Sequence, residues 1–261
     1  MFDDSCYMAP LHLAGRLIME NGGETYRVEE TITRMGHSFG LKEVESFAVP
    51  SGIFISYRKA DGTIETAVKR VRKGAINLTR VNAVNAISRE MEQQQIPCDE
   101  VLSRLQDIER SKPMFGRLGM TAAVAVSSGG WAVMFGGGVM DFLIAIVVCA
   151  LANGLSYLLD RLGMRSLVST LTGSFLATFL PMLFHLWTGL LADGAAAAVS
   201  GALMPMLPGL AMTNAVQDTM RGDMISGISS ATSAVLTASL IAGGALIGTA
   251  SFRLITGGAL L

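Results

Sequence analysis

The sequence predicts a membrane protein in two parts, a small α+β domain over residues 1–115 and an α-helical membrane domain of about five transmembrane helices over residues 116–261. The distribution of charge supports this division, because residues 1–117 hold 16 of the 20 Lys and Arg and 16 of the 21 Asp and Glu. The C-terminal part contains several apolar segments of about 18 to 20 residues or more, the length that crosses the hydrocarbon core as a helix. In the N-terminal part, apolar residues recur instead at the spacings of amphipathic helices and strands.

Four helices are predicted in the N-terminal part. Residues 9–21 carry apolar side chains on one helical face, and Gly22-Gly23 can end this helix with a left-handed cap. A second helix follows, for which Thr25 can serve as the N-cap. A long helix over residues 77–95 and a shorter one after Pro97 complete the set.

Between these helices the spacing changes to that of strands. Residues 43–49 and 53–58 are rich in Val, Ile, Phe and Tyr, and a third strand-like run covers residues 63–68. Asp61-Gly62 separates the last two runs. Both central residues of a type I′ turn need positive φ, and Asp-Gly is a common pair there, so the sequence predicts a tight hairpin.

Five segments of the C-terminal part are free of Asp, Glu, Lys and Arg and are long enough to span a bilayer: 118–140, 142–159, 166–192, 194–217 and 224–252. Basic residues precede the first segment, and they also lie between the second and third and between the fourth and fifth. The intervening loops carry no Lys or Arg. The positive-inside rule then predicts a multi-pass protein of the cell inner (plasma) membrane, with the N-terminal domain in the cytoplasm and the C-terminus outside.

Several functional classes are excluded by the sequence. The acidic start Met1-Phe2-Asp3-Asp4 is unlike the basic beginning of a secretory signal. A net charge of −1 without a concentrated basic surface gives no support for a nucleic-acid partner. The chain contains no nucleophile elbow, Walker A loop or HExxH motif. We therefore predict no enzymatic activity, no catalytic residues, no cofactor and no metal.

The cysteines and histidines form no cluster in the sequence. Three widely spaced cysteines argue against a disulfide framework and against a zinc site, so we expect buried or idle thiols at Cys6, Cys98 and Cys149. The three histidines are isolated from one another and from cysteine. We expect structural roles for His12, His37 and His185.

The fourth apolar segment is predicted to be a broken helix. Pro205, Pro208 and Gly209 lie in its middle, and each proline removes an intrahelical hydrogen bond. Such breaks are tolerated in a membrane only where protein or a water-filled cavity satisfies the freed backbone groups, and transporters often bind substrate there. We place these three residues on a candidate substrate path, the alternative being a kink that serves packing alone.

Polar residues follow this break. Asn214 and Asp218 are four residues apart and share one helix face, and Asp223 lies near the same cytoplasmic end. Because an ionisable group at membrane depth is a functional candidate, we assign Asn214 to the substrate path and Asp218 and Asp223 as coupling candidates. If these carboxylates lie in a loop, they are ordinary solvated charges.

A stripe of hydroxyl groups runs along the third apolar segment at four-residue spacing. We include its members Ser166, Thr170 and Ser174 in the candidate path, because they could line a polar route through the membrane. Helix packing and hydrogen bonds back to the carbonyls of the same helix are the commoner roles for such residues.

Four segments together resemble the threonine/serine exporter family, and the likeness covers essentially the whole chain. These segments are GRLIMENGGETYRVEETITRMGHSFG, FAVPSGIFISY, RVNAVNAISRE and PGLAMTNAVQDTMRGDMISG. The chain is similar to the two-component form, in which a subunit with a cytoplasmic domain and about five spans works with a separate, smaller membrane subunit. The resemblance implies export of threonine and serine, or, for the two-component type, of dicarboxylates such as succinate.

The resemblance also assigns signature residues in both parts. Those of the cytoplasmic domain are Gly15, Glu20, Gly22, Arg27, Val28 and Glu29, and we take Gly22, Glu24, Arg27 and Glu29 as its motif. Those of the membrane domain are Pro208, Gly209, Asn214, Asp218, Gly222, Asp223 and Gly227.

The sequence thus predicts a subunit of a secondary exporter. With no ATP-binding motif, an ion gradient or the substrate gradient would supply the energy. Polar stripes in the spans need a protein or water surface rather than lipid, so we expect a homo-oligomer joined by the smaller subunit. The alternative is a membrane-anchored regulator that senses a ligand and does not transport, although a simple anchor would need neither prolines nor hydroxyl stripes.

Overall fold

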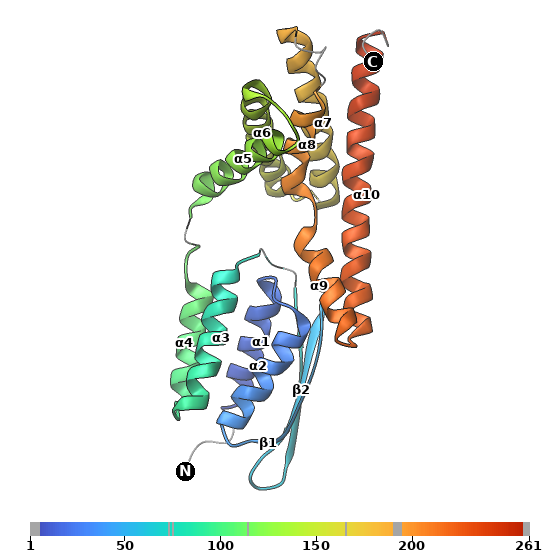
Figure 1. Cartoon of the computed structure of the whole chain (residues 1–261). Coiled ribbons are helices and arrows are strands. Elements are labelled where there is room, and N and C mark those ends of the chain that lie inside the picture. The colour runs from blue at the N-terminus through green and yellow to red at the C-terminus, as the bar shows by residue number, and fades with distance from the viewer. Residues whose placement is uncertain are drawn as a thin grey trace. The chain divides into compact units, whose positions relative to one another are not determined.

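The computed structural model describes residues 6–72, 74, 76–113, 115–164, 166–189 and 195–257 (Figure 1). The chain divides into two compact units. Unit 1 comprises Met1–Pro113 and Leu210–Thr232, and unit 2 comprises Met114–Gly209 and Ser233–Leu261. Unit 1 is therefore built from two stretches that are far apart in the sequence.

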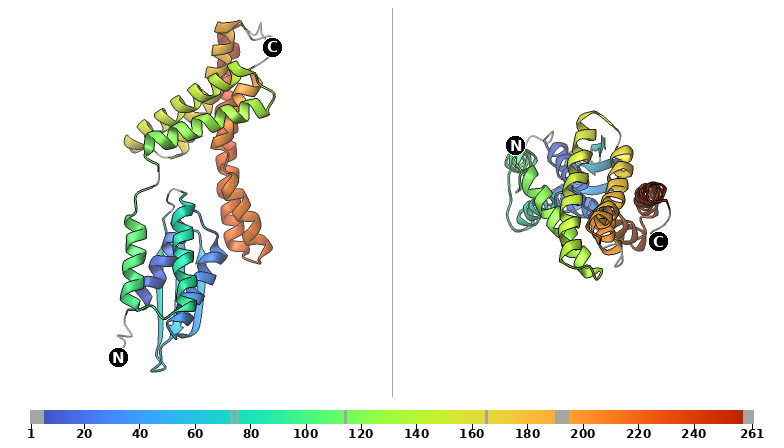
Figure 2. Two further views of the ribbon diagram at one scale, coloured as in Figure 1. Left: turned by 60° about the vertical axis from the view of Figure 1, so that its left-hand side comes forward. Right: turned by 90° about the horizontal axis from the view of Figure 1, so that it is seen from above.

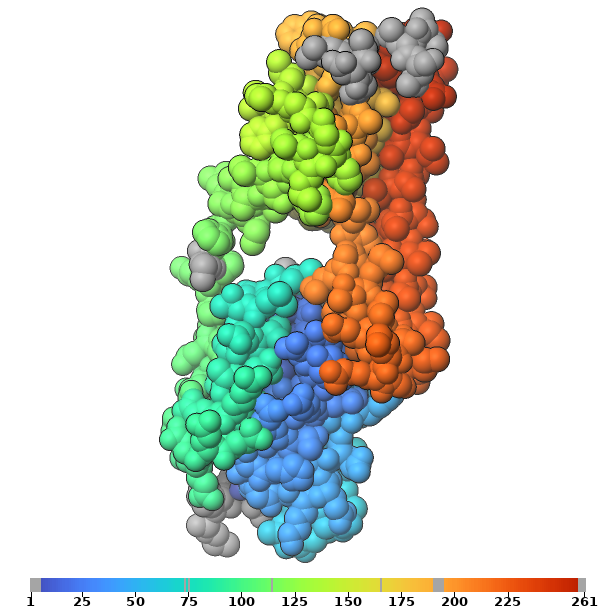
Figure 3. Space-filling view, viewed as in Figure 1, coloured from blue at the N-terminus to red at the C-terminus, as the bar shows by residue number. Residues whose placement is uncertain are grey.

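Unit 1 contains four helices of its N-terminal stretch: α1 (Met8–Glu20), α2 (Thr25–Ser38), α3 (Leu78–Gln93) and α4 (Cys98–Arg110). Helices α1 and α2 pack on the sheet, and α3 and α4 pack on α1 and α2 (Figure 2). Much of the visible face of unit 1 belongs to α3 and α4 (Figure 3). Gly22 follows α1 with a φ of +89°, which favours glycine and fits the predicted end of this helix.

The sheet has three antiparallel strands in the order β1 (Lys42–Val49), β2 (Gly52–Arg58) and β3 (Ile64–Arg70). The centre of its inner face, formed by Ala48, Ile53, Ile55 and Tyr57, is fully buried against the helices. On its outer face Phe47 lies opposite Phe54, which lies opposite Val68, and all three are partly exposed. Alternation of side chains along the strands thus separates a helix-covered face from an open one.

The hairpin between β2 and β3 is tight, but the expected type I′ turn is wrong. Gly62 has a φ of +88°, whereas Asp61 has no positive φ. The carboxylate Oδ1 of Asp61 accepts hydrogen bonds from the backbone N–H of Thr63 at 2.9 Å and from its hydroxyl at 2.6 Å. This local bonding allows the turn to close with one left-handed glycine only.

Two of the cysteines are joined, which corrects the expectation of idle thiols. Cys6, just before α1, forms a disulfide with Cys98 at the start of α4, with the Cα atoms 6.5 Å apart. The pairing results from the packing of α1 beside α4, because the two residues are 92 positions apart in the sequence. Cys149 is a buried free thiol, as expected.

The C-terminal part is helical in all five predicted segments. Its helices are α5 (Arg117–Met134), α6 (Val139–Arg161), α7 (Ser166–Thr188), α8 (Ala196–Leu203), the 3-10 turn η2 (Met204–Met206), α9 (Gly209–Met220) and α10 (Met224–Ile255). Residues 190–194 lie outside the described part of the chain, and with them the predicted end of the third segment and the start of the fourth.

Three helices, α6, α7 and α10, are long and apolar enough to cross a membrane, and there is a fourth crossing if the bent pair Ala196–Met206 and Gly209–Met220 is one span. The expected count of about five is not confirmed, because α5 is not among these helices. Helix α5 begins at Arg117 and contains Ser127-Ser128-Gly129-Gly130, which lowers its mean hydropathy. Large apolar side chains such as Leu151, Leu167 and Leu246 are exposed on the other helices, as suits contact with lipid.

The fourth segment is interrupted at the predicted prolines. Helix α8 ends at Leu203, Pro205 lies in the 3-10 turn, and α9 begins only at Gly209. Leu207, the residue before Pro208, has an extended backbone with a ψ of 137°. Proline disfavours the helical conformation at the residue that precedes it, which explains the position of the break.

Glycines allow close helix contacts inside unit 2. A Cβ added at Gly201 in α8 would lie 2.7 Å from the backbone N of Ala132 and 2.7 Å from the carbonyl O of Ser128, both in α5. The hydroxyl of Ser128 donates to the carbonyls of Gly201 at 3.0 Å and Ala145 at 3.2 Å, and so links α5 with α8 and α6. Small residues at such crossings are typical of membrane helix packing.

We expect Gly201→Ala to destabilise unit 2, because the added methyl group meets backbone atoms that cannot move aside. Overpacking of this kind costs about 1–3 kcal/mol of unfolding free energy. Thermal unfolding of the detergent-solubilised protein should show a lower Tm for the variant. Gly154→Ala in α6 is the matched control, since nothing lies within 4 Å of its added Cβ, and an equal Tm for the two variants would contradict the close contact.

Candidate functional site

Predicted residues from both ends of the sequence meet at the start of α2. The side-chain Nδ2 of Asn214 in α9 donates to the carbonyl O of Gly22 at 3.3 Å. The hydroxyl of Thr25 donates to Oδ2 of Asp223 at 3.0 Å. These bonds join residues 192 and 198 positions apart, and all of them belong to unit 1.

The turn between α9 and α10 supplies one side of this contact. Gly222 has a φ of +91°, so the chain reverses at a residue without a side chain. Oδ1 of Asp223 accepts from the backbone N–H of Ser226 at 3.2 Å, which satisfies a free donor at the start of α10. One carboxylate therefore both begins α10 and binds α2.

Thr25 does not act as the N-cap that the sequence predicts. It is the first residue of α2, the N-cap position belongs to Glu24, and no side chain caps the helix. Its hydroxyl instead donates to Asp223, which leaves the capping expectation wrong. The physical reason is that α2 already includes Thr25, whereas a capping side chain belongs to the residue before the first helical one, from which it accepts the N–H of N2 or N3.

Glu29 lies one turn further along α2. Its Oε1 accepts from the backbone N–H of Ala48 in β1 at 2.9 Å, and the carbonyl of Ala48 accepts from the hydroxyl of Ser226 at 3.3 Å. Burial raises the pKa of Glu29; the Ala48 bond lowers it, and the negative charges of Asp223 and Asp218 raise it further. Glu29 is therefore a carboxylate held in a place that disfavours its charge.

Asp218 in α9 is only 2% exposed, and its Oδ1 has no hydrogen-bond partner among the described residues. The same is true of two other buried oxygens on this side of α9, Oδ1 of Asn214 and Oε1 of Gln217. Three side-chain acceptors without a donor are costly to bury. Buried unsatisfied groups of this kind call for a functional explanation, such as a proton or a donor brought by a ligand.

These residues form what we call the acid cluster: Glu24, Glu29, Asp218 and Asp223, with Thr25 among them. The negative charges of Asp218 and Asp223 repel that of Glu29, so the arrangement favours a proton on Glu29. Within the described ranges, no group of three or more His, Cys, Asp and Glu is arranged to hold a metal ion. The chemistry that the cluster can support is proton binding and release.

The remaining candidates for the substrate path belong to unit 2 and lie in two places, the break before α9 and helix α7. Pro205, Pro208 and Gly209 lie at the break before α9. In α7 the hydroxyl of Thr170 donates to the carbonyl of Ser166 at 3.0 Å, and that of Ser174 to the carbonyl of Thr170 at 2.9 Å. These two hydroxyls thus donate to carbonyls of their own helix.

One buried pair was missed by the sequence reasoning. His185 in α7 is 3% exposed, and its Nε2 lies 3.0 Å from Oδ1 of Asp141 in α6, while its Nδ1 lies 3.0 Å from the carbonyl O of Pro181. Both ring nitrogens thus face oxygen atoms, one on the neighbouring helix α6 and one on the same helix. A signal was available, because the end of one predicted span and the start of another face the same side of the membrane.

We expect Glu29→Gln to raise the Tm at pH 7. A carboxyl whose pKa is raised by folding stabilises the folded state only while protonated, so this stability is lost as pH rises from the ordinary value of about 4.3 through the raised one. Glutamine mimics the protonated form and still accepts from Ala48. The difference in Tm from the unchanged protein should therefore shrink as the pH falls below about 4.3.

Glu90→Gln in α3 is the control of opposite sign. Its hydrogen bond to Arg104 lowers the pKa of Glu90, so the charged form is the stabilising one and the substitution should lower the Tm at pH 7. A fall in Tm for Glu29→Gln at pH 7 would show that the charged Glu29 stabilises the fold.

Comparison with known proteins gives a consistent result. A family described as "Putative threonine/serine exporter" (ThrE) matches residues 11–252. A protein of Klebsiella aerogenes named "Probable succinate transporter subunit YjjP" is 24% identical over 212 residues, which cover 81% of this chain and 80% of that protein. No solved structure matches the chain significantly. The family and the apolar helices indicate a multi-pass membrane transporter rather than an enzyme, and the chain belongs to the threonine/serine exporter family.

Proposed function

We propose that this chain is a subunit of a secondary exporter in the cell inner membrane, with its N-terminus in the cytoplasm. The exported molecules are small polar metabolites, either threonine and serine or dicarboxylates such as succinate. Family membership supports the first class, and the name of the Klebsiella aerogenes relative supports the second. That name also supports a second subunit, because the relative is called a subunit of a transporter.

The observation that carries this proposal is the broken fourth segment and the carboxylate that follows it. The helix stops before Pro208 and resumes as α9, which buries Asp218 with an unpartnered oxygen. Interrupted helices in transporters offer free backbone groups to a substrate, and buried carboxylates bind coupling protons. Both features therefore occur within one short stretch of the chain.

The acid cluster provides a physical route from proton binding to movement. With a shared proton, Asp218 can donate to a neighbouring oxygen and repulsion among the carboxylates falls. Without it, the negative charges of Asp218, Asp223 and Glu29 repel one another across the contact between α2 and the α9–α10 turn. Protonation thus favours the closed contact, and deprotonation weakens it.

We expect Asp218→Asn to abolish efflux or to uncouple it from the pH gradient, because asparagine cannot exchange a proton. The measurement is efflux of serine, threonine and succinate from loaded vesicles, with this subunit alone and with its partner subunit. Pro208→Ala should impair efflux by favouring a continuous helix. Both variants should insert into the membrane normally.

Asp107→Asn, on the exposed side of α4, is the matched control and should export at the normal rate. Asp193→Asn, a substitution in a predicted outer loop, should also change efflux little. Asp193 lies outside the described residues. Normal rate and normal pH dependence in both Asp218→Asn and Asp223→Asn would exclude the coupling role. An absence of efflux of all three compounds, even with the partner subunit present, would contradict the exporter itself.

The proposed orientation can be measured separately with reporter fusions. Fusions after Arg161 and Arg221 should report a cytoplasmic location, because these basic residues stay inside. A fusion after Gly138 should report the outside, as should one after Ala192, which is not among the described residues. An outside signal from the Arg161 fusion would exclude the five-span topology.

A further inference from the structure

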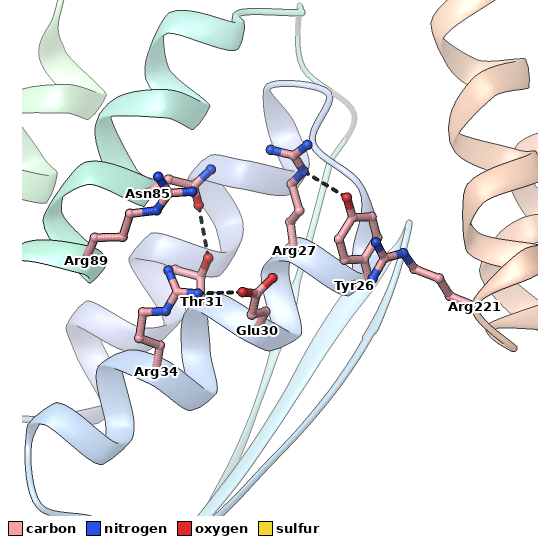
Figure 4. Close-up of a pocket in the computed structure, with 8 residues that line it drawn as sticks. All are labelled: Tyr26, Arg27, Glu30, Thr31, Arg34, Asn85, Arg89 and Arg221. Carbon is pink, nitrogen blue, oxygen red and sulfur yellow. Dashed lines mark hydrogen bonds and ion pairs between the residues drawn. The ribbon is translucent and has the colours of Figure 1, made fainter. Parts of the chain in front are cut away.

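We propose that a pocket of unit 1, distinct from the acid cluster, binds a small dicarboxylate anion. The pocket has a volume of about 250 Å³ and lies between α2, α3 and the turn after α9 (Figure 4). It is lined by Tyr26, Arg27, Glu30, Thr31, Arg34, Asn85, Arg89 and Arg221. The inference rests on the proposed function, because it chooses between the two substrate classes named there, but binding to this pocket can be measured without transport.

The charges around the pocket are not balanced. Four arginines line it against one carboxylate, that of Glu30. Arg27 forms an ion pair with Glu24, and Arg34 forms one with Glu30. Within the described residues, neither Arg89 nor Arg221 has a carboxylate within 4.0 Å, so two guanidinium groups have no anionic partner.

Tyr26 fixes the position of one of these groups. The guanidinium of Arg221 lies over the Tyr26 ring, 3.6 Å from its centroid, and the Tyr26 hydroxyl accepts from Nε of Arg27 at 3.2 Å. A guanidinium stacked by its face keeps its N–H edge free for a carboxylate. Tyr26 is therefore a positioning residue for a cation that would otherwise be a flexible surface side chain.

The other unpaired group comes from the opposite side of the pocket, as Figure 4 shows. Arg89 belongs to α3, one turn after Asn85. Oδ1 of Asn85 accepts from the Thr31 hydroxyl at 3.2 Å, which orients the amide and leaves its NH₂ group to donate. This side therefore offers a cation and a neutral donor on one helix face.

Two separated positive ends select the class of ligand. A molecule with a carboxylate at each end can engage Arg221 and Arg89 together, whereas phosphate is compact and would use one end only. Glu30, the carboxylate of the lining, is already paired with Arg34, so the ammonium group of a zwitterionic amino acid would lie against a guanidinium, which costs free energy. The geometry thus favours a short dicarboxylate over both alternatives.

The test is isothermal titration calorimetry of the purified full-length protein in detergent, with succinate, inorganic phosphate and serine as probes. Succinate should bind more tightly than phosphate or serine. Arg89→Gln and Arg221→Gln should each weaken succinate binding at least tenfold, while Arg89→Lys, which keeps the charge, should lose less. Arg70→Gln, a surface arginine of β3 outside the pocket, removes the same charge and should leave the affinity unchanged.

Tyr26 supplies a further discriminating pair. Tyr26→Phe keeps the ring beneath Arg221 and should bind nearly normally, whereas Tyr26→Leu should bind as weakly as Arg221→Gln. Each variant is compared at an unchanged Tm, which excludes unfolding as the cause of weak binding.

The proposal is overturned if succinate does not bind at millimolar concentration, if phosphate or serine binds as tightly, or if Arg70→Gln weakens binding as much as Arg89→Gln. Succinate binding with no efflux of any tested compound would contradict the proposed export function and leave the pocket assignment intact. Efflux without succinate binding would contradict the pocket assignment and leave the proposed export function intact.

Discussion

The contact between the first turn of α2 and the α9–α10 turn is the interaction on which both candidate sites of unit 1 depend. It includes the hydrogen bond from Thr25 to Asp223 and the stacking of Arg221 on Tyr26, and the bond from Asn214 to the Gly22 carbonyl lies beside it. Asp223 also starts α10 through the N–H of Ser226. The α9–α10 turn supplies Asp223 to the acid cluster and Arg221 to the pocket that four arginines line. A displacement of this turn therefore alters both sites.

Local patterns were sufficient for most of the secondary structure. Apolar spacing predicted α1 to α4 and the three strands within a few residues, and the glycine after α1 adopts the left-handed backbone that its position indicated. Sequence patterns did not predict which of several possible partners a side chain would bind. Asp61 bonds to Thr63 and changes the turn type, and Cys6 reaches Cys98 only because α1 packs beside α4.

The candidate site was predictable as a set of residues but not as an arrangement. Asp218 was notable as the carboxylate that directly follows the fourth apolar segment. Its neighbours Glu24 and Thr25 lie about 190 positions earlier in the chain, and no periodicity links such distant segments. Of the residues that line the pocket with four arginines, only Arg27 belonged to a predicted motif, because the lining residues come from three separate elements. The pair of His185 and Asp141 was also not predicted, although both residues lie at ends of predicted spans that face the same side of the membrane.

The discontinuity of unit 1 has a consequence for biosynthesis. The ribosome completes residues 1–113 long before residues 210–232, with the apolar helices α5 to α8 made in between. At about 5–20 residues per second this interval lasts roughly 5–20 seconds. During that time Glu29 and Thr25 lack the α9–α10 turn, so the nascent N-terminal stretch exposes an unfinished surface while the next segments enter the bilayer. The acid cluster can therefore form only after helices α5 to α8 have been synthesised.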